Sequence, residues 1–140
     1  PFFKAKEFGA VNVTLPYKET VIPYLDEISD IARRIGAVNT VVNRGGRLFG
    51  YNTDYYGMKA LIERIGIDLT AKKVLVLGTG GTSKTARVVA ADLGAAEILT
   101  VSRRKTDHYI TYEEADQEQP TTLTNKEKWE RYEEAFFHEM

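Results

Sequence analysis

The segment KVLVLGTGGTSKTARVVAADLGAAEILTVSRR, residues 73–104, decides the fold class of this 140-residue chain. It opens with KVLVL at residues 73–77, which is continuously apolar after Lys73, as expected of a buried strand in a parallel sheet. A glycine-rich loop follows, then a helix that we expect to end near Leu93, before Gly94, and then a second apolar strand ending at Ser102. A strand, a helix and a strand in about 30 residues form the β-α-β unit, which requires a parallel sheet.

The loop Gly78-Thr79-Gly80-Gly81-Thr82 lies directly between the first strand and the helix. Glycines let the backbone turn tightly and approach a pyrophosphate closely. The helix N-terminus adds free N–H groups and the positive end of the helix dipole. This context predicts a dinucleotide-binding site, and the alternative is a tight strand-to-helix turn that binds nothing.

The end of the second strand bears on which dinucleotide is bound. NAD sites usually place Asp or Glu there, to bind the 2′-hydroxyl of the ribose. This strand ends Ser102-Arg103-Arg104, without an acid. Guanidinium groups suit a phosphate, so the pattern favours NADP over NAD. The alternative is that Arg103 and Arg104 are solvated surface charges.

The residues before this unit predict a second group of helices and strands. We expect helices at residues 2–8 and 26–35 and a third from Thr53 or Asp54 to about Ile65, each followed by glycine. Residues 10–15 alternate between apolar and polar side chains and end at Pro16, as a strand does. Residues 37–51 predict a hairpin that turns at Arg44-Gly45-Gly46-Arg47.

Three polar clusters stand near the ends of these strands: Asn12/Thr14/Lys18, Asn39/Thr40 and Asn52/Thr53/Asp54. We expect these strands to be parallel, so that the Asn and Thr at their ends can bind a polyol or carboxylate ligand. A lysine near a carboxylate and shielded from water can transfer a proton to or from a hydroxyl, so Lys18 and Asp54 are a candidate pair. Taken alone, each residue also has an ordinary interpretation. Lys18 would be a solvated surface lysine, Asp54 a helix N-cap, and Asn12 and Asn39 turn-forming residues.

Composition excludes several classes of protein. With no cysteine there is neither a disulfide scaffold nor a cysteine-based zinc site, and with only two histidines we expect no metal site. No apolar run approaches the ~18 residues of a membrane span, and the first residues lack the apolar core of a signal peptide. We expect a cytoplasmic protein that acts on a small molecule, without a nucleic-acid or membrane partner; the oligomeric state stays open.

The charge distribution marks a boundary near residue 105. Residues 1–104 carry 15 Lys and Arg against 10 Asp and Glu, whereas residues 105–140 carry 4 against 10. Residues 105–121 have no clear period. A capping-box pattern and an aromatic stripe at helical spacing then predict an amphipathic helix over residues 125–138.

Four motifs, in this order and spacing, resemble those of shikimate dehydrogenase. They are Asn12-Val13-Thr14-Leu15-Pro16-Tyr17-Lys18, Gly36-Ala37-Val38-Asn39-Thr40, Gly50-Tyr51-Asn52-Thr53-Asp54-Tyr55-Tyr56-Gly57 and Val76-Leu77-Gly78-Thr79-Gly80-Gly81. The resemblance covers about residues 1–104. It implies a partial substrate-binding and catalytic domain at residues 1–65, a partial NADP-binding Rossmann domain at 66–104, and a divergent acidic tail with one amphipathic helix at 105–140.

The resemblance also implies a fold and a reaction. The family has an α/β fold, in which an open substrate-binding sheet is followed by a parallel Rossmann unit with the active site in the cleft between them. Its members reversibly reduce 3-dehydroshikimate to shikimate with NADPH, in aromatic amino-acid biosynthesis. We therefore expect an NADP-dependent oxidoreductase that works by hydride transfer.

Site residues carry over motif by motif. Lys18 and Asp54 match the catalytic pair of the family, and the substrate-binding positions match Asn12, Thr14 and Asn39. The cofactor-binding glycine loop matches Gly78, Thr79, Gly80, Gly81 and Thr82. The motif for the 2′-phosphate, typically N-R-T, matches Ser102, Arg103 and Arg104, so that the arginine is retained while its neighbours differ.

The chain also departs from the family pattern. It starts without Met, after the strand whose Ser-x-Ser motif holds the shikimate carboxylate, and residues 105–140 do not resemble the rest of the Rossmann sheet or the glutamine-bearing C-terminal helix. We therefore expect a partial chain with weak cofactor affinity and little turnover. Two alternatives stay open: a quinate/shikimate dehydrogenase that uses NAD, and a non-catalytic dinucleotide-binding or interaction fragment.

Overall fold

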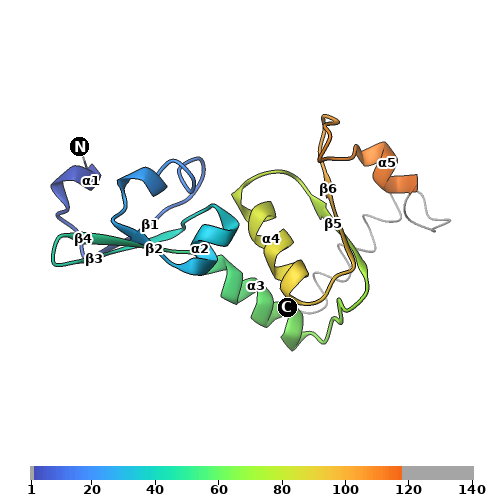
Figure 1. The fold of residues 1–140 in the computed structure, drawn as a ribbon, viewed down its shortest axis with the longest axis horizontal. Helices are drawn as coiled ribbons and strands as arrows, with labels where there is room; N and C mark the ends of the chain where they lie inside the picture. Colours follow the sequence, from blue (N-terminus) through green and yellow to red (C-terminus); the bar gives the residue numbers. More distant parts are fainter. Residues whose placement is uncertain (1, 118–140) are drawn as a thin grey trace.

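A computed structural model describes residues 2–117, in which two sheets stand at opposite ends of a group of three helices (Figure 1). The expected helix at residues 125–138, with most of the acidic tail, lies outside the described residues. The described part confirms the α/β class, because a mixed sheet is followed by a parallel β-α-β unit.

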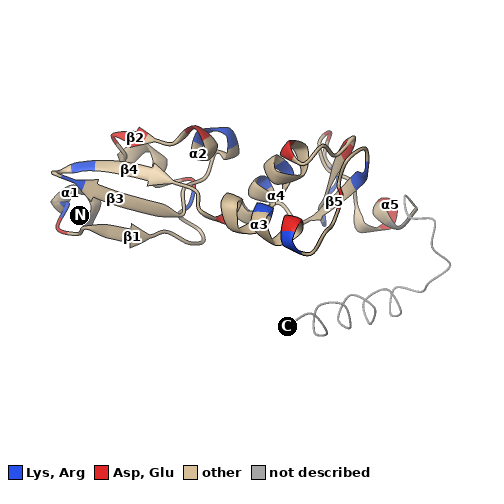
Figure 2. Ribbon diagram, turned by 90° about the horizontal axis from the view of Figure 1, so that it is seen from below, with Lys and Arg blue, Asp and Glu red and all other residues tan. Residues whose placement is uncertain are grey.

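The first sheet contains β1 (Ala10–Asn12), β2 (Glu27–Ile28), β3 (Thr40–Arg44) and β4 (Arg47–Tyr51), in the order β1-β3-β4-β2. Strand β3 is antiparallel to both β1 and β4, and β2 is parallel to β4. Figure 2 shows β1, β3 and β4 side by side. The predicted hairpin is confirmed, and its turn uses Gly45 and Gly46 at φ angles of 60° and 83°, which glycine adopts without strain.

Four short helical segments accompany this sheet: α1 (Phe2–Ala5), the 3-10 helix η1 (Ile22–Tyr24), α2 (Asp30–Ile35) and α3 (Asp54–Arg64). The expected helix at residues 26–35 is wrong over its first four residues. There the backbone pairs with β4, since Asp26 N–H donates to Leu48 O at 3.0 Å and Ser29 N–H donates to Gly50 O at 2.9 Å. The helix begins only after Ser29, whose hydroxyl accepts from Ala32 N–H.

The second sheet consists of β5 (Lys73–Leu77) and β6 (Glu97–Val101), joined by α4 (Gly81–Asp92). The two strands are parallel and in register from Lys73 opposite Glu97 to Leu77 opposite Val101, which confirms the predicted unit. A short helix, α5 (Tyr112–Gln117), lies in the stretch where the sequence has no clear period.

Two groups of buried apolar residues make up the core. The first packs η1, α2 and the hairpin together and consists of Val13, Val21, Ala32, Val38, Val41 and Leu48. The second joins three helices, since Ile35 of α2 and Tyr55 of α3 pack with Val89 of α4. Helix α4 therefore contacts the first sheet's helices as well as its own strands, as Figure 1 shows.

We predict that Leu48→Ala lowers the free energy of unfolding by about 2–5 kcal/mol, because Leu48 is fully buried (0% exposed) and its loss leaves a cavity. Leu15→Ala is the matched control, since that leucine is 68% exposed. Urea unfolding followed by circular dichroism measures both. Equal effects of the two substitutions would contradict this account of the core.

Candidate active site

The polar clusters of residues 12–54 meet at one end of the strands of the first sheet, but for a different reason than expected. Strand β1 ends at Asn12 opposite Thr40, which begins β3, and β4 ends at Tyr51 opposite the same Thr40. The expectation of parallel strand ends is thus wrong, because both pairings are antiparallel. An antiparallel pairing puts the end of one strand beside the start of the next, which gathers these residues equally well.

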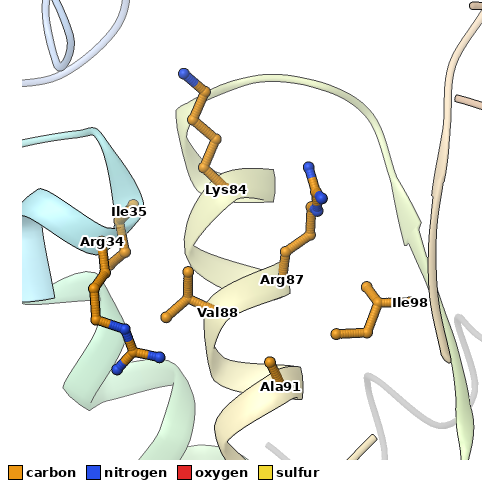
Figure 3. Close-up of a pocket in the computed structure, with 7 residues that line it drawn as sticks. All are labelled: Arg34, Ile35, Lys84, Arg87, Val88, Ala91 and Ile98. Atoms are coloured by element: carbon orange, nitrogen blue, oxygen red, sulfur yellow. The ribbon is translucent and has the colours of Figure 1, made fainter. Parts of the chain in front are cut away.

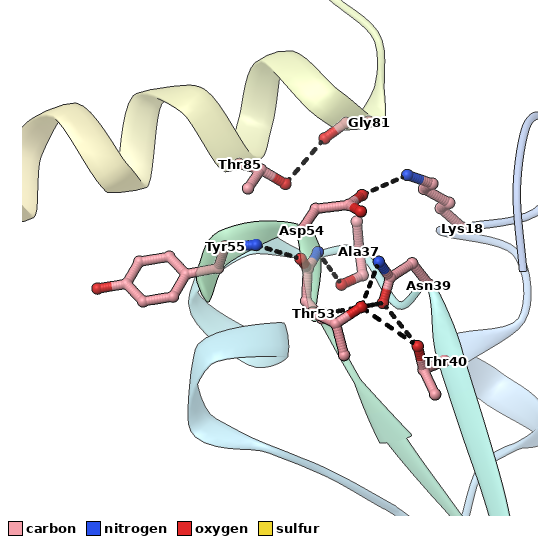
Figure 4. A network of polar contacts seen from close by, with 10 residues as sticks. Lys18, Ala37, Asn39, Thr40, Thr53, Asp54, Tyr55, Gly81 and Thr85 are labelled. Carbon is pink, nitrogen blue, oxygen red and sulfur yellow. Dashed lines mark hydrogen bonds and ion pairs between the residues drawn. The ribbon is translucent and has the colours of Figure 1, made fainter. Parts of the chain in front are cut away.

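Lys18 and Asp54 form an ion pair at this edge, with Lys18 Nζ 2.6 Å from Asp54 Oδ2 (Figure 4). The lysine side chain is only 12% exposed. Its backbone is held where Val38 N–H donates to Lys18 O at 2.7 Å. Asp54 is the first residue of α3, where the helix dipole favours a carboxylate. The lysine is therefore largely shielded from water and close enough to Asp54 to exchange a proton, while the Asp54 side chain is 35% exposed.

Next to the pair, Asn39 and Thr53 are joined by a set of hydrogen bonds (Figure 4). Asn39 Oδ1 accepts from Thr53 N–H at 2.9 Å, and Asn39 Nδ2 donates to Thr53 Oγ1 at 3.0 Å. Thr40 Oγ1 donates to Asn39 Oδ1 at 3.1 Å. These contacts fix the Asn39 amide beside Asp54, so the amide is oriented before any ligand arrives.

The other two predicted substrate-binding residues are exposed. Asn12 ends β1, and Thr14 begins the turn toward Lys18, with Thr14 O accepting from Tyr17 N–H at 2.8 Å. Both lie on the chain segment that leads to Lys18, and their exposed side chains are open to a ligand.

Asn52 has a role that the sequence analysis did not assign. Its side chain is buried, with Oδ1 accepting from Tyr55 N–H at 3.2 Å and Nδ2 donating to Ala37 O at 3.0 Å. The side chain that caps α3 is therefore that of Asn52 and not that of Thr53 or Asp54 as expected. The motif Asn52-Thr53-Asp54 could have indicated this, since Asn caps helices as readily as Asp does.

The glycine loop reaches the same place from the second sheet. Gly78, which continues from β5, has a φ of 104° that favours glycine, and its N–H donates to Val101 O. Thr79 and Gly80 lead into α4, which begins at Gly81. A Cβ atom built on Gly81 would lie 3.4 Å from Lys18 Cδ, so the helix N-terminus rests directly on the lysine stem. Figure 4 shows α4 starting above the Lys18–Asp54 pair.

The predicted 2′-phosphate residues stand at the end of the neighbouring strand. Ser102 follows β6, and its N–H donates to Ile110 O at 2.8 Å, while its hydroxyl accepts from Arg104 N–H at 3.2 Å. Arg103 and Arg104 are both exposed. The glycine loop and these arginines therefore share the carboxyl edge of the parallel strands, where open α/β sheets bind ligands.

Two ion pairs join helix α4 to the residues of the first sheet and its helices, and the sequence did not predict either of them. Arg34 donates to both carboxylate oxygens of Asp92, at 2.6 and 3.1 Å, and Tyr55 Oη donates to Asp92 Oδ2 at 2.6 Å. Lys84 Nζ lies 2.7 Å from Glu19 Oε2. The partners are far apart in the chain, and no local pattern pairs them.

A cavity of about 450 Å³ runs along the side of α4 between α2 and β6 (Figure 3). It is lined by Arg34, Ile35, Lys84, Arg87, Val88, Ala91 and Ile98. Neither Lys18 nor Asp54 is among these residues, so the cavity is separate from the candidate active site.

Within residues 2–117, no helix has the length and apolar character to cross a membrane. The same residues contain no group of three or more His, Asp and Glu side chains arranged to hold a metal ion.

Comparison with known proteins gives the family. Residues 2–41 match the model of the shikimate dehydrogenase substrate binding domain. The NADP(+) shikimate dehydrogenase of Halothermothrix orenii is 50% identical over 101 residues, which are 71% of this chain and 35% of that protein. Over the matched residues, this chain is similar to shikimate dehydrogenases. It spans just over a third of the length of the curated relatives it matches.

Solved shikimate dehydrogenases have the same fold. Shikimate dehydrogenase 1 of Peptoclostridium difficile is 39% identical, with a TM-score of 0.75 over 88% of this chain and 50% of that one. The Thermus thermophilus enzyme, solved with NADP(H) and shikimate, is 39% identical, with a TM-score of 0.63 over 71% of this chain and 38% of that one.

Acid is expected to remove the contribution of Asp92 to the stability of the fold. Hydrogen bonds from Arg34 and then Tyr55 hold the pKa of Asp92 below its usual range. A lowered pKa stabilises the fold fully above the unfolded value of about 3.9, and this contribution is lost as pH falls through the folded value.

We therefore expect the unfolding free energy of the parent to exceed that of Asp92→Asn by a constant amount at pH values from about 7 to 5, and the difference to shrink below about pH 4. Urea unfolding across this range measures it. A difference that grows toward acid would refute the assignment.

Proposed function

We propose that the protein to which this chain belongs interconverts 3-dehydroshikimate and shikimate by NADP-dependent hydride transfer. The observation that carries the proposal is the Lys18–Asp54 pair, 2.6 Å apart, with a nearly buried lysine whose stem lies against the start of α4. In this proposal residues 1–65 supply the substrate-binding part and residues 66–104 the cofactor-binding part.

The donors on this chain fit NADP. Gly78, Thr79, Gly80, Gly81 and Thr82 would hold the pyrophosphate at the positive end of the α4 dipole. Ser102, Arg103 and Arg104 would hold the 2′-phosphate, which guanidinium groups bind well. When bound, NADPH supplies the hydride that reduces the substrate carbonyl carbon.

The proton is handled by this chain's own residues. Lys18 Nζ donates a proton to the substrate oxygen as the carbonyl becomes a hydroxyl, and it takes the proton back in the reverse direction. The carboxylate of Asp54 orients Nζ and stabilises its charge at 2.6 Å. Asn12, Thr14 and Asn39 are proposed to bind the substrate's hydroxyl and carboxylate groups, with the Asn39 amide already fixed by Thr53.

The first experiment is shikimate-dependent reduction of NADP by the 140-residue chain, followed by nicotinamide absorbance. Lys18→Ala should lower the rate by about 100- to 10,000-fold, which is the usual contribution of a general acid or base. Lys72→Ala, an exposed lysine outside the site, is the matched control and should leave the rate unchanged. A rate that survives Lys18→Ala, or a chain that neither turns over nor binds shikimate by calorimetry, would defeat the proposal.

Cofactor choice has a separate test. We expect Arg103→Ala to weaken NADP binding about 10- to 100-fold, because a charge-assisted hydrogen bond to phosphate contributes about 1.5–3 kcal/mol, and to leave NAD binding unchanged. Calorimetric titration with each dinucleotide measures this, with Arg64→Ala at the end of α3 as the control. Equal losses for NADP and NAD would show that Arg103 does not read the 2′-phosphate, and would favour the NAD-using quinate/shikimate alternative.

A further inference from the structure

Helix α4 is tied to the first half of the chain at its carboxyl end by the three residues Tyr55, Asp92 and Arg34, which we call the clamp. Asp92 is the last residue of α4 and its carboxylate accepts three hydrogen bonds, two from Arg34 in the last turn of α2 and one from Tyr55 in the first turn of α3. Three helices thus converge on one carboxylate.

The position of Asp92 is unfavourable for its own helix. A carboxylate in the last turn lies at the negative end of the helix dipole, where Lys, Arg or His is preferred. Its ion pair with Arg34 and its bond to Tyr55 offset this cost. Figure 3 shows Arg34 reaching along α4 from the last turn of α2. The carboxylate therefore serves contacts between helices rather than the stability of α4 alone.

The first turn of α3 connects the clamp to the candidate active site. Asp54 and Tyr55 are consecutive, and they point in opposite directions: Asp54 toward Lys18, and the ring of Tyr55 away from that pair (Figure 4). Asn52 holds this turn by accepting from Tyr55 N–H. One helical turn thus carries both a residue of the clamp and a residue of the candidate pair.

At its other end, α4 rests on the same pair. The N-terminal residue Gly81 lies against the stem of Lys18, at 3.4 Å from a built Cβ to Cδ. Between the two ends, Val89 is fully buried against Ile35 and Tyr55. Helix α4 is thus packed at Val89 and held at Asp92, and these contacts together determine where its N-terminus lies.

We propose that Tyr55, Asp92 and Arg34 are positioning residues, which hold α4 so that the glycine loop stands over Lys18 and Asp54. None of the three touches the proposed substrate or cofactor. The kinetic part of this proposal rests on the proposed function, whereas the structural part does not.

The test compares Tyr55→Phe and Asp92→Asn with the control Tyr56→Phe, which removes the same hydroxyl from the next residue, a tyrosine that is 61% exposed. Because the chain has no cysteine, spin labels can be attached at Thr20→Cys and Arg87→Cys. Both positions are exposed, the first in the turn that carries Lys18 and the second in α4. Electron-electron resonance then measures the distance between the turn that carries Lys18 and helix α4 in the full chain.

We expect a broadened or shifted distance distribution in Tyr55→Phe and Asp92→Asn, and the parent distribution in Tyr56→Phe. Identical distributions in all four proteins would overturn the proposal. If circular dichroism shows that either clamp variant is unfolded, Arg34→Lys replaces it, since it keeps the charge of a half-exposed side chain but loses the two-pronged geometry.

Steady-state kinetics with shikimate and NADP gives the second readout. Tyr55→Phe should lower kcat by up to about 100-fold, as expected when reacting groups are misplaced by about 1 Å. KM for shikimate should stay unchanged, because the proposed substrate-binding residues belong to the first half of the chain. An unchanged kcat, or a loss confined to KM, would refute the positioning role. Little or no turnover by the parent is expected of a partial chain, and the distance measurement would then decide on the clamp by itself.

Discussion

The packing of α4 against α2 and α3 is the contact on which the rest of this structure depends. Val89 is fully buried against Ile35 and Tyr55, and this apolar contact joins a mixed sheet to a parallel β-α-β unit. Without it, the glycine loop and the Lys18–Asp54 pair would belong to separate bodies. With it, the N-terminus of α4 lies against the Lys18 stem, and one site draws on both halves of the chain.

The site combines two features that have different physical origins. The Lys18–Asp54 pair depends on a nearly buried lysine whose charge is compensated at 2.6 Å, at the N-terminus of a helix that favours the carboxylate. The glycine loop depends on a backbone geometry, since Gly78 has a φ of 104°. In the proposed function, the first would handle the proton and the second would bind an anionic group of the cofactor.

Several expectations were right because their signals are local. The β-α-β unit, the hairpin and the α2 boundary at Gly36, which has a φ of 72°, follow from apolar runs, turn residues and capping. Other expectations were wrong where a tertiary contact overrode the local pattern. Ile28 stands at helical spacing from Ile31 and Ile35, but the backbone of residues 26–29 pairs with β4. Gly50 of β4 allows this close approach, since a Cβ there would lie 2.5 Å from Leu25 Cδ1 and 3.1 Å from Ile28 Cγ2. The sequence carries no signal for that pairing partner.

The sequence by itself determined the fold class, the family motifs and the residues that carry the proposed chemistry, because each of these depends on a pattern of residues close together in the chain. Only the tertiary structure decided which of those residues meet. Lys18 and Asp54 are 36 positions apart, and strand pairing in the first sheet brings them together. Arg34 and Asp92 are 58 positions apart, and helix packing brings them into contact. Strand direction, the buried cap from Asn52 and the placement of α4 over the pair were likewise decided in three dimensions. The physical reason is that burial and long-range hydrogen bonding depend on which surfaces pack together, and that information is spread over the whole chain.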